Sequence, residues 1–144
     1  MKTIEAEIFI GASPGQVWSV LTDFEKWPQW NRIMPGIVSE LVEGTRIKLT
    51  LALPGRRTSY QKPLLTRVAA NRELRWYEKV ISPKIFASEH WYHLEATETG
   101  CRVRQGEQFD GLLSAMMGKK TLEETERLFM VMNRDLKERV EELG

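Results

Sequence analysis

The segment HWYHLEATETGCRVRQGEQF, residues 90–109, predicts two strands joined by a tight turn. The dipeptide Thr99-Gly100 is the turn signal between them. If these two residues form the turn, Ala96 opposes Val103 and the two strands run antiparallel. The segment is therefore a β-hairpin, and its two faces can be told apart by composition.

One face of this hairpin is the better candidate for the buried, concave side of a sheet. Side-chain alternation places the even positions from 90 to 96 and the odd positions from 103 to 109 on that face. Its apolar members are Leu94, Ala96, Val103 and Phe109, and its polar members are His90, Tyr92, Gln105 and Glu107. In this register His90 and Glu107 are diagonal neighbours, about 7–8 Å apart at the backbone. The opposite face is less apolar and carries Glu89, Trp91, His93 and Glu95.

Strand patterns continue on the N-terminal side of the hairpin. Apolar residues alternate with polar ones over residues 45–53 and again over residues 74–80. Turn signals such as Pro54-Gly55 separate these patterns. Residues 37–109 therefore predict an antiparallel meander of about six strands.

A further strand and a short helical region precede the meander. Residues 3–10 alternate with apolar side chains on one face, which predicts a half-buried strand and brings the total to about seven. Ser13, Pro14 and Gln16 then match the N-cap, N1 and N3 positions of a helix. Helical structure is expected to end near Trp27, because the next residue is proline.

The C-terminal segment predicts a long amphipathic helix. Thr121 and Glu124 fit a capping box at its start. Its apolar stripe consists of Leu122, Phe129, Met132, Leu136, Val140 and Leu143. Residues 112–119 are expected to form a shorter helical piece before it, bounded by Gly111 and Gly118. The long helix is the only predicted element large enough to cover one face of the sheet.

Composition limits the class of protein further. The chain has 144 residues, 42% of them apolar and 28% charged, which is ordinary for one globular domain over residues 1–144. A net charge of +1 argues against a nucleic-acid-binding protein. No apolar run approaches the roughly 18 residues that a membrane-spanning helix needs. The N-terminus carries acidic residues where a signal peptide needs an apolar stretch, so a cytoplasmic location is expected.

The scarcity of histidine and cysteine argues against a metal site. His90 and His93 are three positions apart, so they point to opposite faces of one strand. Cys101, the single cysteine, lies beside the turn and away from His90. Neither a zinc site nor a Cys-His or Ser-His-Asp nucleophile is expected. The chain has no glycine-rich phosphate loop, and no cofactor is expected.

Several segments together resemble the START-like or SRPBCC superfamily along essentially the whole chain. They are VWSVLTDF (17–24), WPQWN (27–31), NRELRW (71–76), HWYHLE (90–95), TGCRV (99–103) and QGEQFDGLL (105–113). The resemblance implies an α+β helix-grip fold, in which a curved antiparallel sheet of about seven strands wraps around a long C-terminal helix. It also implies short helices between the first and second strands, and a cavity between sheet and helix. Cys101 departs from the pattern, because threonine is common at its position.

Members of this superfamily bind lipids, sterols, polyketides, quinones or plant hormones, and some are aromatase/cyclases. The resemblance therefore implies binding or transport of a hydrophobic small molecule in the cavity. Ligand-binding residues are expected on the concave face, on the strands beside it, on the long helix and at the rim. The candidates are Trp30, Leu49, Leu51, Trp76, His90, Tyr92, Leu94, Gln105, Glu107, Phe109, Met117, Phe129, Met132 and Leu136.

The polar residues of the concave face allow two interpretations. They form a hydrogen-bonded network that fixes the sheet against the helix, since buried polar groups usually find partners within the protein. Alternatively, they orient the polar end of a ligand in a mainly apolar pocket, as is common in small-molecule sites. The sequence leaves both interpretations open.

Two alternatives to a ligand-binding protein also stay open. A polyketide cyclase or aromatase-like enzyme would use His90 and Glu107 as catalytic acid–base residues. A protein-interaction module would fill the cavity with side chains and use the exposed part of the apolar run at residues 128–132 as its interface. We expect a monomer or a homodimer, with no nucleic-acid partner and no integral membrane segment.

Overall fold

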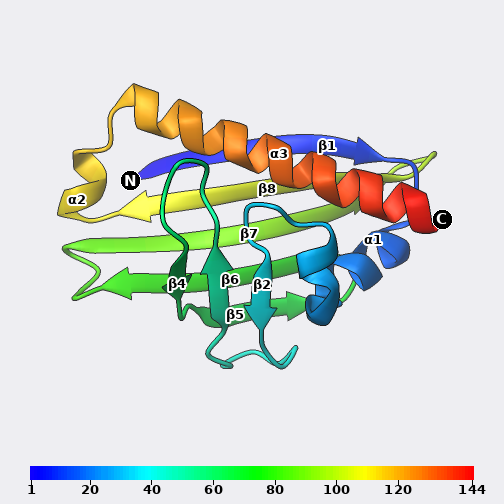
Figure 1. Ribbon diagram of the computed structural model, residues 1–144, viewed down its shortest axis with the longest axis horizontal. Helices are drawn as coiled ribbons and strands as arrows, with labels where there is room; N and C mark the ends of the chain where they lie inside the picture. Colours follow the sequence, from blue (N-terminus) through cyan, green and yellow to red (C-terminus); the bar gives the residue numbers. More distant parts are fainter.

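Two antiparallel sheets and a long C-terminal helix make up most of the protein, whose residues 1–144 are described by a computed structural model (Figure 1). The strands are β1 (Lys2–Ile10), β2 (Gly36–Val38), β3 (Lys48–Leu51), β4 (Ser59–Gln61), β5 (Leu64–Ala69), β6 (Glu73–Val80), β7 (Phe86–Ala96) and β8 (Cys101–Asp110). The helices are α1 (Pro14–Thr22), the 3-10 helix η1 (Phe24–Gln29), α2 (Leu112–Ala115) and α3 (Lys119–Leu143).

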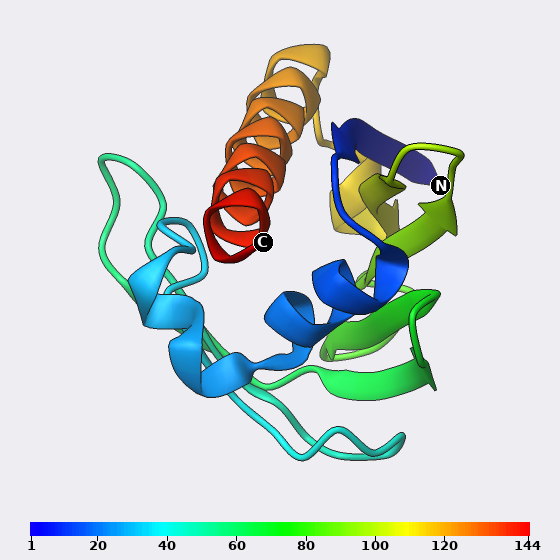
Figure 2. The ribbon, with the colours of Figure 1, turned by 90° about the vertical axis from the view of Figure 1, so that its right-hand side faces the viewer.

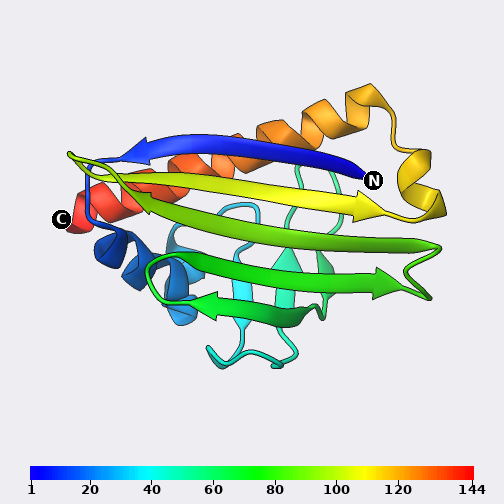
Figure 3. The ribbon, with the colours of Figure 1, turned by 180° about the vertical axis from the view of Figure 1, so that it is seen from behind.

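The larger sheet wraps around α3. Its strand order is β1-β8-β7-β6-β5, and the smaller sheet has the order β2-β3-β4. Figure 3 shows the long strands side by side, with α3 running along their far side. The view along α3 in Figure 2 shows the strands curving around the helix, with α1 lying against it. The predicted α+β helix-grip arrangement is confirmed.

The strands number eight and form two sheets, where the sequence predicted one sheet of about seven. The division falls between β4 and β5, at Lys62 and Pro63. Proline has no backbone N–H to donate to a strand ladder, and the chain turns there from the small sheet into the large one. An isolated bridge between Arg46 and Leu64 joins the two sheets at this point. The small sheet therefore forms a second layer, separate from the larger sheet.

The turn into α1 has the predicted helix-start geometry. The Ser13 hydroxyl accepts the backbone N–H of Gln16 at 3.2 Å, and the Gln16 side chain accepts the backbone N–H of Ser13 at 2.9 Å. Pro14 occupies the first turn, where no backbone donor is needed. The indole of Trp27 donates to the Leu21 carbonyl at 3.0 Å and fixes η1 against α1. The short helices expected after the first strand are confirmed.

The β7–β8 hairpin differs by two residues from the predicted register. Ala96 pairs with Cys101, and residues 97–100 form a longer turn, closed by a hydrogen bond from the Thr97 N–H to the Gly100 carbonyl (2.9 Å). The two-residue turn is wrong because the tip of the hairpin packs against the end of β1. A Cβ added to Gly100 would lie 2.2 Å from the carbonyl oxygen of Ile10. Ile10 belongs to β1, so the sequence of the hairpin alone does not reveal this contact.

The predicted concave face survives this correction. A shift of two residues preserves side-chain alternation, so the even positions of β7 and the odd positions of β8 still face α3. The correction does change one neighbour relation. His90 lies directly opposite Glu107, whereas the predicted register made the two residues diagonal neighbours.

Helix α3 begins two residues before the predicted capping box. Gly118 is its N-cap, and the first helical hydrogen bond runs from the Leu122 N–H to the Gly118 carbonyl (3.2 Å). The predicted start at Thr121 is wrong because this bond closes the first turn before Thr121 can act as a cap. The apolar stripe is buried at Phe129, Met132, Leu136 and Val140, while Leu122 is half-buried and Leu143 is exposed. The shorter helical piece before α3 is confirmed as α2.

Candidate functional site

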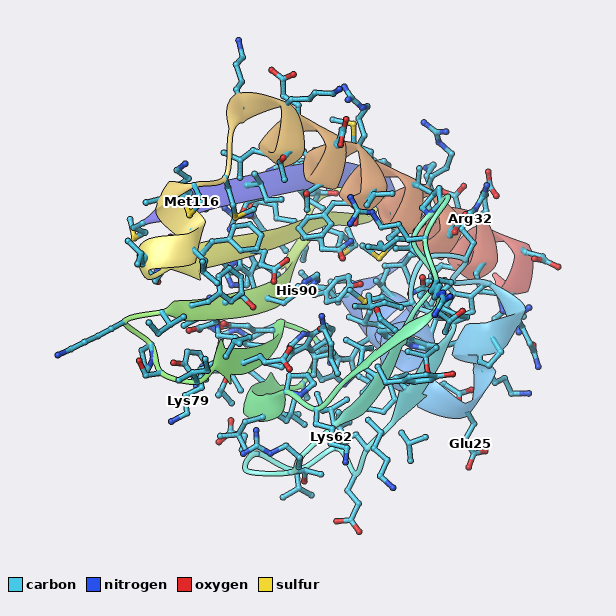
Figure 4. The ribbon with its side chains drawn as sticks, turned by 60° about the vertical axis from the view of Figure 1, so that its left-hand side comes forward. Glu25, Arg32, Lys62, Lys79, His90 and Met116 are labelled. Atoms are coloured by element: carbon cyan, nitrogen blue, oxygen red, sulfur yellow. The ribbon has the colours of Figure 1, made fainter.

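A cavity of about 150 Å³ lies between α3, the larger sheet and the wall that includes β3. Its apolar lining consists of Ile33, Met34, Leu49, Leu51, Leu53, Trp76, Leu128, Phe129 and Met132. Its polar lining consists of Gln61, Glu78, Ser88, His90, Glu107 and Thr125. Figure 4 shows His90 in the space between α3 and the strands that face it. The cavity is comparable to one that holds a benzene ring, and is smaller than the roughly 300–1,000 Å³ of a drug-sized site.

Aromatic side chains hold the ring of His90 in place. Cross-strand pairing puts Trp76 opposite His90, and the two rings stack with centroids 4.6 Å apart and planes 9° apart. Phe129 of α3 meets the same ring edge-on, with centroids 5.0 Å apart. His90 is only 2% exposed, so packing fixes the orientation of its ring.

A chain of buried amides lies behind His90. Its Nε2 is 2.9 Å from Oε1 of Gln105 on β8. The Gln105 amide donates to Oδ1 of Asn133 on α3 at 2.8 Å. The Asn133 amide donates in turn to the backbone carbonyl of Ala6 on β1 at 3.0 Å. These contacts tie α3 to two strands of the larger sheet.

This chain of amides fixes the neutral tautomer of His90. The Ala6 carbonyl can only accept, so Asn133 must present its NH2 group to Ala6 and its oxygen to Gln105. Gln105 must then present its own oxygen to His90. Nε2 of His90 therefore carries a proton, and Nδ1 of the neutral ring is left as a hydrogen-bond acceptor.

Two carboxyl groups share the cavity with His90. Glu107 lies directly across from it on β8, with a carboxylate oxygen 3.8 Å from Nδ1. Glu78 lines the cavity from β6. Burial raises the pKa of Glu78, and the negative charge of Glu107 adds to the rise, while a backbone hydrogen bond from Lys62 and the charge of Arg46 oppose it. No lysine or arginine side chain lines the cavity.

The structure brings some of the residues proposed from the sequence to the cavity and leaves others outside. Those that line it are Leu49, Leu51, Trp76, His90, Glu107, Phe129 and Met132. Tyr92, Leu94, Gln105 and Leu136 are buried in the core and are not part of the lining. Burial raises the pKa of the Tyr92 phenol, which keeps it protonated.

The three other proposed residues lie near the ends of α3. Phe109 packs against Phe86 where β8 runs into α2, with ring centroids 6.2 Å apart. Met117 is half-buried just before α3 begins. Trp30 is half-buried beside Trp27, with ring centroids 5.6 Å apart, near the C-terminal half of α3. Phe109 belongs to the hydrophobic core, Met117 and Trp30 pack against that core, and none of the three lines the cavity.

Sequence reasoning missed part of the lining. The missed residues are Ile33, Met34, Leu53, Gln61, Glu78, Ser88, Thr125 and Leu128. Ser88 has the same parity as His90, and Glu78 the same parity as Trp76, so strand alternation contained the signal for both. Ile33 and Met34 follow η1 in an irregular segment, where no periodicity marks a buried side chain.

The polar residues of the concave face divide between the two interpretations left open above. Gln105 is fully buried and bonded on both sides of its amide, which is the arrangement of a structural network. Glu107 is part of the cavity lining, which is the position that ligand orientation requires. His90 belongs to both, with Nε2 in the network and Nδ1 on the side of Glu107.

Most side chains of the apolar run at residues 128–132 are buried or half-buried. Phe129 and Met132 are buried, Leu128 and Val131 are half-buried, and Met130 is 46% exposed. Leu128, Phe129 and Met132 line the cavity. A single exposed methionine leaves little apolar surface on this run for a protein partner.

The outer face of β7 carries a separate network of charges. His93 points to this face, as alternation predicts, and its Nε2 lies 3.3 Å from a carboxylate oxygen of Glu73. Arg75 bridges Glu73 at 2.8 Å and Glu89 at 2.6 Å. The two histidines therefore lie on opposite faces of the sheet. The structure contains no group of three or more His, Cys, Asp or Glu side chains arranged to hold a metal ion.

The sequence matches a family model described as polyketide cyclase/dehydrase and lipid transport, over residues 1–141. No curated protein matches the chain. None of its helices combines the length and the hydropathy needed to cross a lipid bilayer.

Several solved structures share the fold. A START superfamily protein from Mycobacterium smegmatis gives a TM-score of 0.78 at 17% identity, covering 99% of each chain. The protein MLL2253 from Mesorhizobium loti gives 0.75 at 16% identity, again covering 99% of each chain. The di-domain ARO/CYC StfQ from the steffimycin biosynthetic pathway gives 0.72 at 14% identity, covering 97% of this chain and 50% of StfQ, so this chain spans about half the length of StfQ. At these identities the likeness shows the fold, and the resemblance to START-like proteins is confirmed.

Proposed function

The chain belongs to the polyketide cyclase/dehydrase and lipid transport family, and we propose that it binds or transports a small hydrophobic molecule in the cavity beneath α3. The cavity lining carries this proposal. Its walls are mostly apolar, and His90 and Glu107 stand together as polar groups within it. Such a combination is typical of small-molecule sites, where apolar walls supply affinity and a few polar groups fix orientation.

Burial of apolar surface would drive binding. Each Å² of apolar ligand surface removed from water contributes about 25 cal/mol, before the cost of lost ligand motion. The cavity admits a group about the size of one ring. A larger ligand must move the wall formed by β3 away from α3, or leave part of itself outside. His90 and Glu107 would then orient the polar end of the enclosed part.

Native mass spectrometry of the purified protein, followed by extraction under denaturing conditions, tests this proposal. We expect either a co-purified hydrophobic molecule, released on denaturation, or an empty protein whose Tm rises with apolar ring compounds. The matched variant Ser88→Phe places a ring where the cavity lies and should abolish both signals. Leu128→Phe is a second filling variant on α3, for use if Ser88→Phe does not fold. A wild-type protein with neither an adduct nor a rise in Tm would contradict the proposal.

A second candidate function is acid–base catalysis in the same cavity, of the cyclase or dehydratase kind. The observation that favours it is the 3.8 Å approach of His90 Nδ1 to Glu107, with the proton of the neutral ring held on Nε2. Nδ1 is then free to take a proton from a bound substrate. Replacing His90 with alanine, or Glu107 with glutamine, should abolish turnover of a substrate while ligand binding is largely kept. Turnover that survives both replacements would rule this candidate out.

A further inference from the structure

Glu78, His90 and Glu107 give the cavity lining a group of hydrogen-bond acceptors, while Gln61, Ser88 and Thr125 can both donate and accept. Glu78 and Glu107 contribute carboxyl groups, which accept when ionised. The amide chain from Ala6 holds a proton of His90 on Nε2, so Nδ1 is the acceptor of this ring in its neutral form. A ligand that places a hydroxyl or amino hydrogen here finds several partners.

No lysine or arginine side chain belongs to the same lining. Arg46 is the only basic side chain whose charge acts on Glu78, and its guanidinium donates to the Lys62 carbonyl at 3.1 Å outside the cavity. An anionic group in the cavity would face two carboxyl groups with no lysine or arginine beside it. Burying an unpaired charge is costly, and a like charge nearby adds to that cost.

We infer that the ligand of this cavity is an uncharged molecule, about one ring wide where it is enclosed, that presents a hydroxyl or amino donor to His90 and Glu107 and carries no carboxylate or phosphate there. The inference rests on the proposed function, because it names the chemical class of the molecule that the cavity binds. It sets free fatty acids and phosphate-bearing head groups apart from neutral ring alcohols, phenols and aromatic amines.

Three probes of nearly equal size separate these possibilities: toluene, phenol and benzoate. Each is titrated into 15N-labelled protein at pH 7, and the dissociation constant is taken from the amide shifts of residues around the cavity. Toluene reports on the apolar cavity alone, phenol adds a donor, and benzoate adds a negative charge. We expect phenol to bind at least about tenfold more tightly than benzoate, since even a partly screened charge repulsion reaches that size.

The variant Glu107→Gln assigns the discrimination to the cavity carboxyl group. It keeps the size of the side chain and removes one negative charge, so the preference for phenol over benzoate should shrink severalfold, with each affinity expressed relative to that of toluene in the same protein. The control Glu95→Gln removes the same charge from the outer face of β7, where Glu95 is 57% exposed and pairs with Arg102 at 3.5 Å. It should leave the preference as it is in the wild type. The cost of dehydrating benzoate is the same in all these proteins and cancels in the comparison.

The outcomes distinguish this inference from the proposed function. Binding of toluene and phenol, with weak binding of benzoate that improves in Glu107→Gln, supports the inference. Benzoate binding as tightly as phenol in the wild type overturns the inference and leaves hydrophobic binding intact. An equal preference for phenol in Glu107→Gln and in the wild type also overturns it. Failure of every probe, toluene included, overturns the proposed function itself.

Discussion

The imidazole of His90 is a donor on one side and an acceptor on the other, because the amides behind it allow a single orientation. We predict that the neutral ring carries its proton on Nε2. Long-range 1H–15N correlation spectra of the histidine rings distinguish the two tautomers, and His93 on the outer face provides an internal comparison. A neutral His90 ring protonated on Nδ1 would contradict the hydrogen-bond chain.

The variant Asn133→Leu tests whether the chain causes this tautomer. It removes the acceptor of the Gln105 amide, so Gln105 can turn over and offer either its oxygen or its nitrogen to His90. We expect the His90 ring to become a mixture of tautomers in this variant. It also leaves a buried amide unpaired, which should cost about 1–3 kcal/mol of the free energy of unfolding.

The carboxyl group of Glu78 predicts a pH-dependent stability. Burial raises its pKa above the ordinary value of 4.5, so the folded protein holds this proton more tightly than the unfolded chain does. The free energy of unfolding contributed by this group therefore falls as pH rises through the ordinary pKa and the raised one. Replacing Glu78 with glutamine removes that fall. We expect Glu78→Gln to gain stability over the wild type at pH 7, and to gain less at pH 4.

Urea unfolding of both proteins at the two pH values measures this difference. The control Glu40→Gln removes a carboxylate from an exposed position and should show a smaller dependence on pH. A gain for Glu78→Gln that is the same at pH 4 and pH 7 would show that the raised pKa does not contribute.

Side-chain alternation within individual strands was enough to predict which face of the sheet some of these residues occupy. Alternation put His90 and Glu107 on one face even though the predicted register of the hairpin was off by two residues, because a shift of two preserves parity. The hydrogen-bond network that includes Gln105 could not be predicted from the strand patterns. Asn133 and Ala6 come from α3 and β1, and only the packing of helix on sheet brings them to β8.

Helix α3 is fastened to the segment after η1 by a bidentate ion pair. The Asp135 carboxylate accepts from Nε of Arg32 at 3.0 Å and from Nη2 at 2.7 Å. Figure 4 shows Arg32 lying beside the helix. The pair is unequal, since the side chain of Asp135 is 4% exposed and that of Arg32 is 66% exposed. The two halves of the pair should therefore differ in their effect when removed.

We predict that Arg32→Ala lowers the free energy of unfolding more than Asp135→Asn does. The first change leaves a buried carboxylate without its partner, while the second leaves a guanidinium that water can solvate. Urea denaturation midpoints measure the order, with Arg134→Ala on the exposed side of the same helix as a control. Equal losses, or a larger loss for Asp135→Asn, would mean that the buried carboxylate finds other stabilisation.

Helices and strands were predictable as elements, but less so at their ends. The start of α1 was readable because Ser13 and Gln16 satisfy each other locally. The start of α3 was not, because the chain enters the helix from Gly118, which has no side chain to mark a cap. The sequence likewise did not predict the break between the two sheets. It depends on the turn at Pro63, and the strand pattern of residues 45–53 shortens to β3 (Lys48–Leu51).

The cavity is a property of how the layers stand against one another. Alternation and helical periodicity identify which side chains face inward, and residues such as Leu49, Trp76 and Met132 do meet there. Its volume depends on the distance between α3 and the wall of β3, which no local pattern encodes. The sequence could therefore predict a cavity lined by these side chains, while its size and the entry of Ile33 and Met34 into its lining required the structure.

Titration of methyl-labelled protein with toluene, followed in 1H–13C spectra, shows whether an apolar molecule enters this cavity. We predict saturable shifts concentrated on the methyl groups of Met34, Leu49, Leu51, Leu128 and Met132. The exposed methyl groups of Met116 and Leu143 should stay unchanged. An absence of saturable shifts, or shifts centred on those exposed residues, would contradict the account of this protein as one that binds a hydrophobic molecule beneath its C-terminal helix.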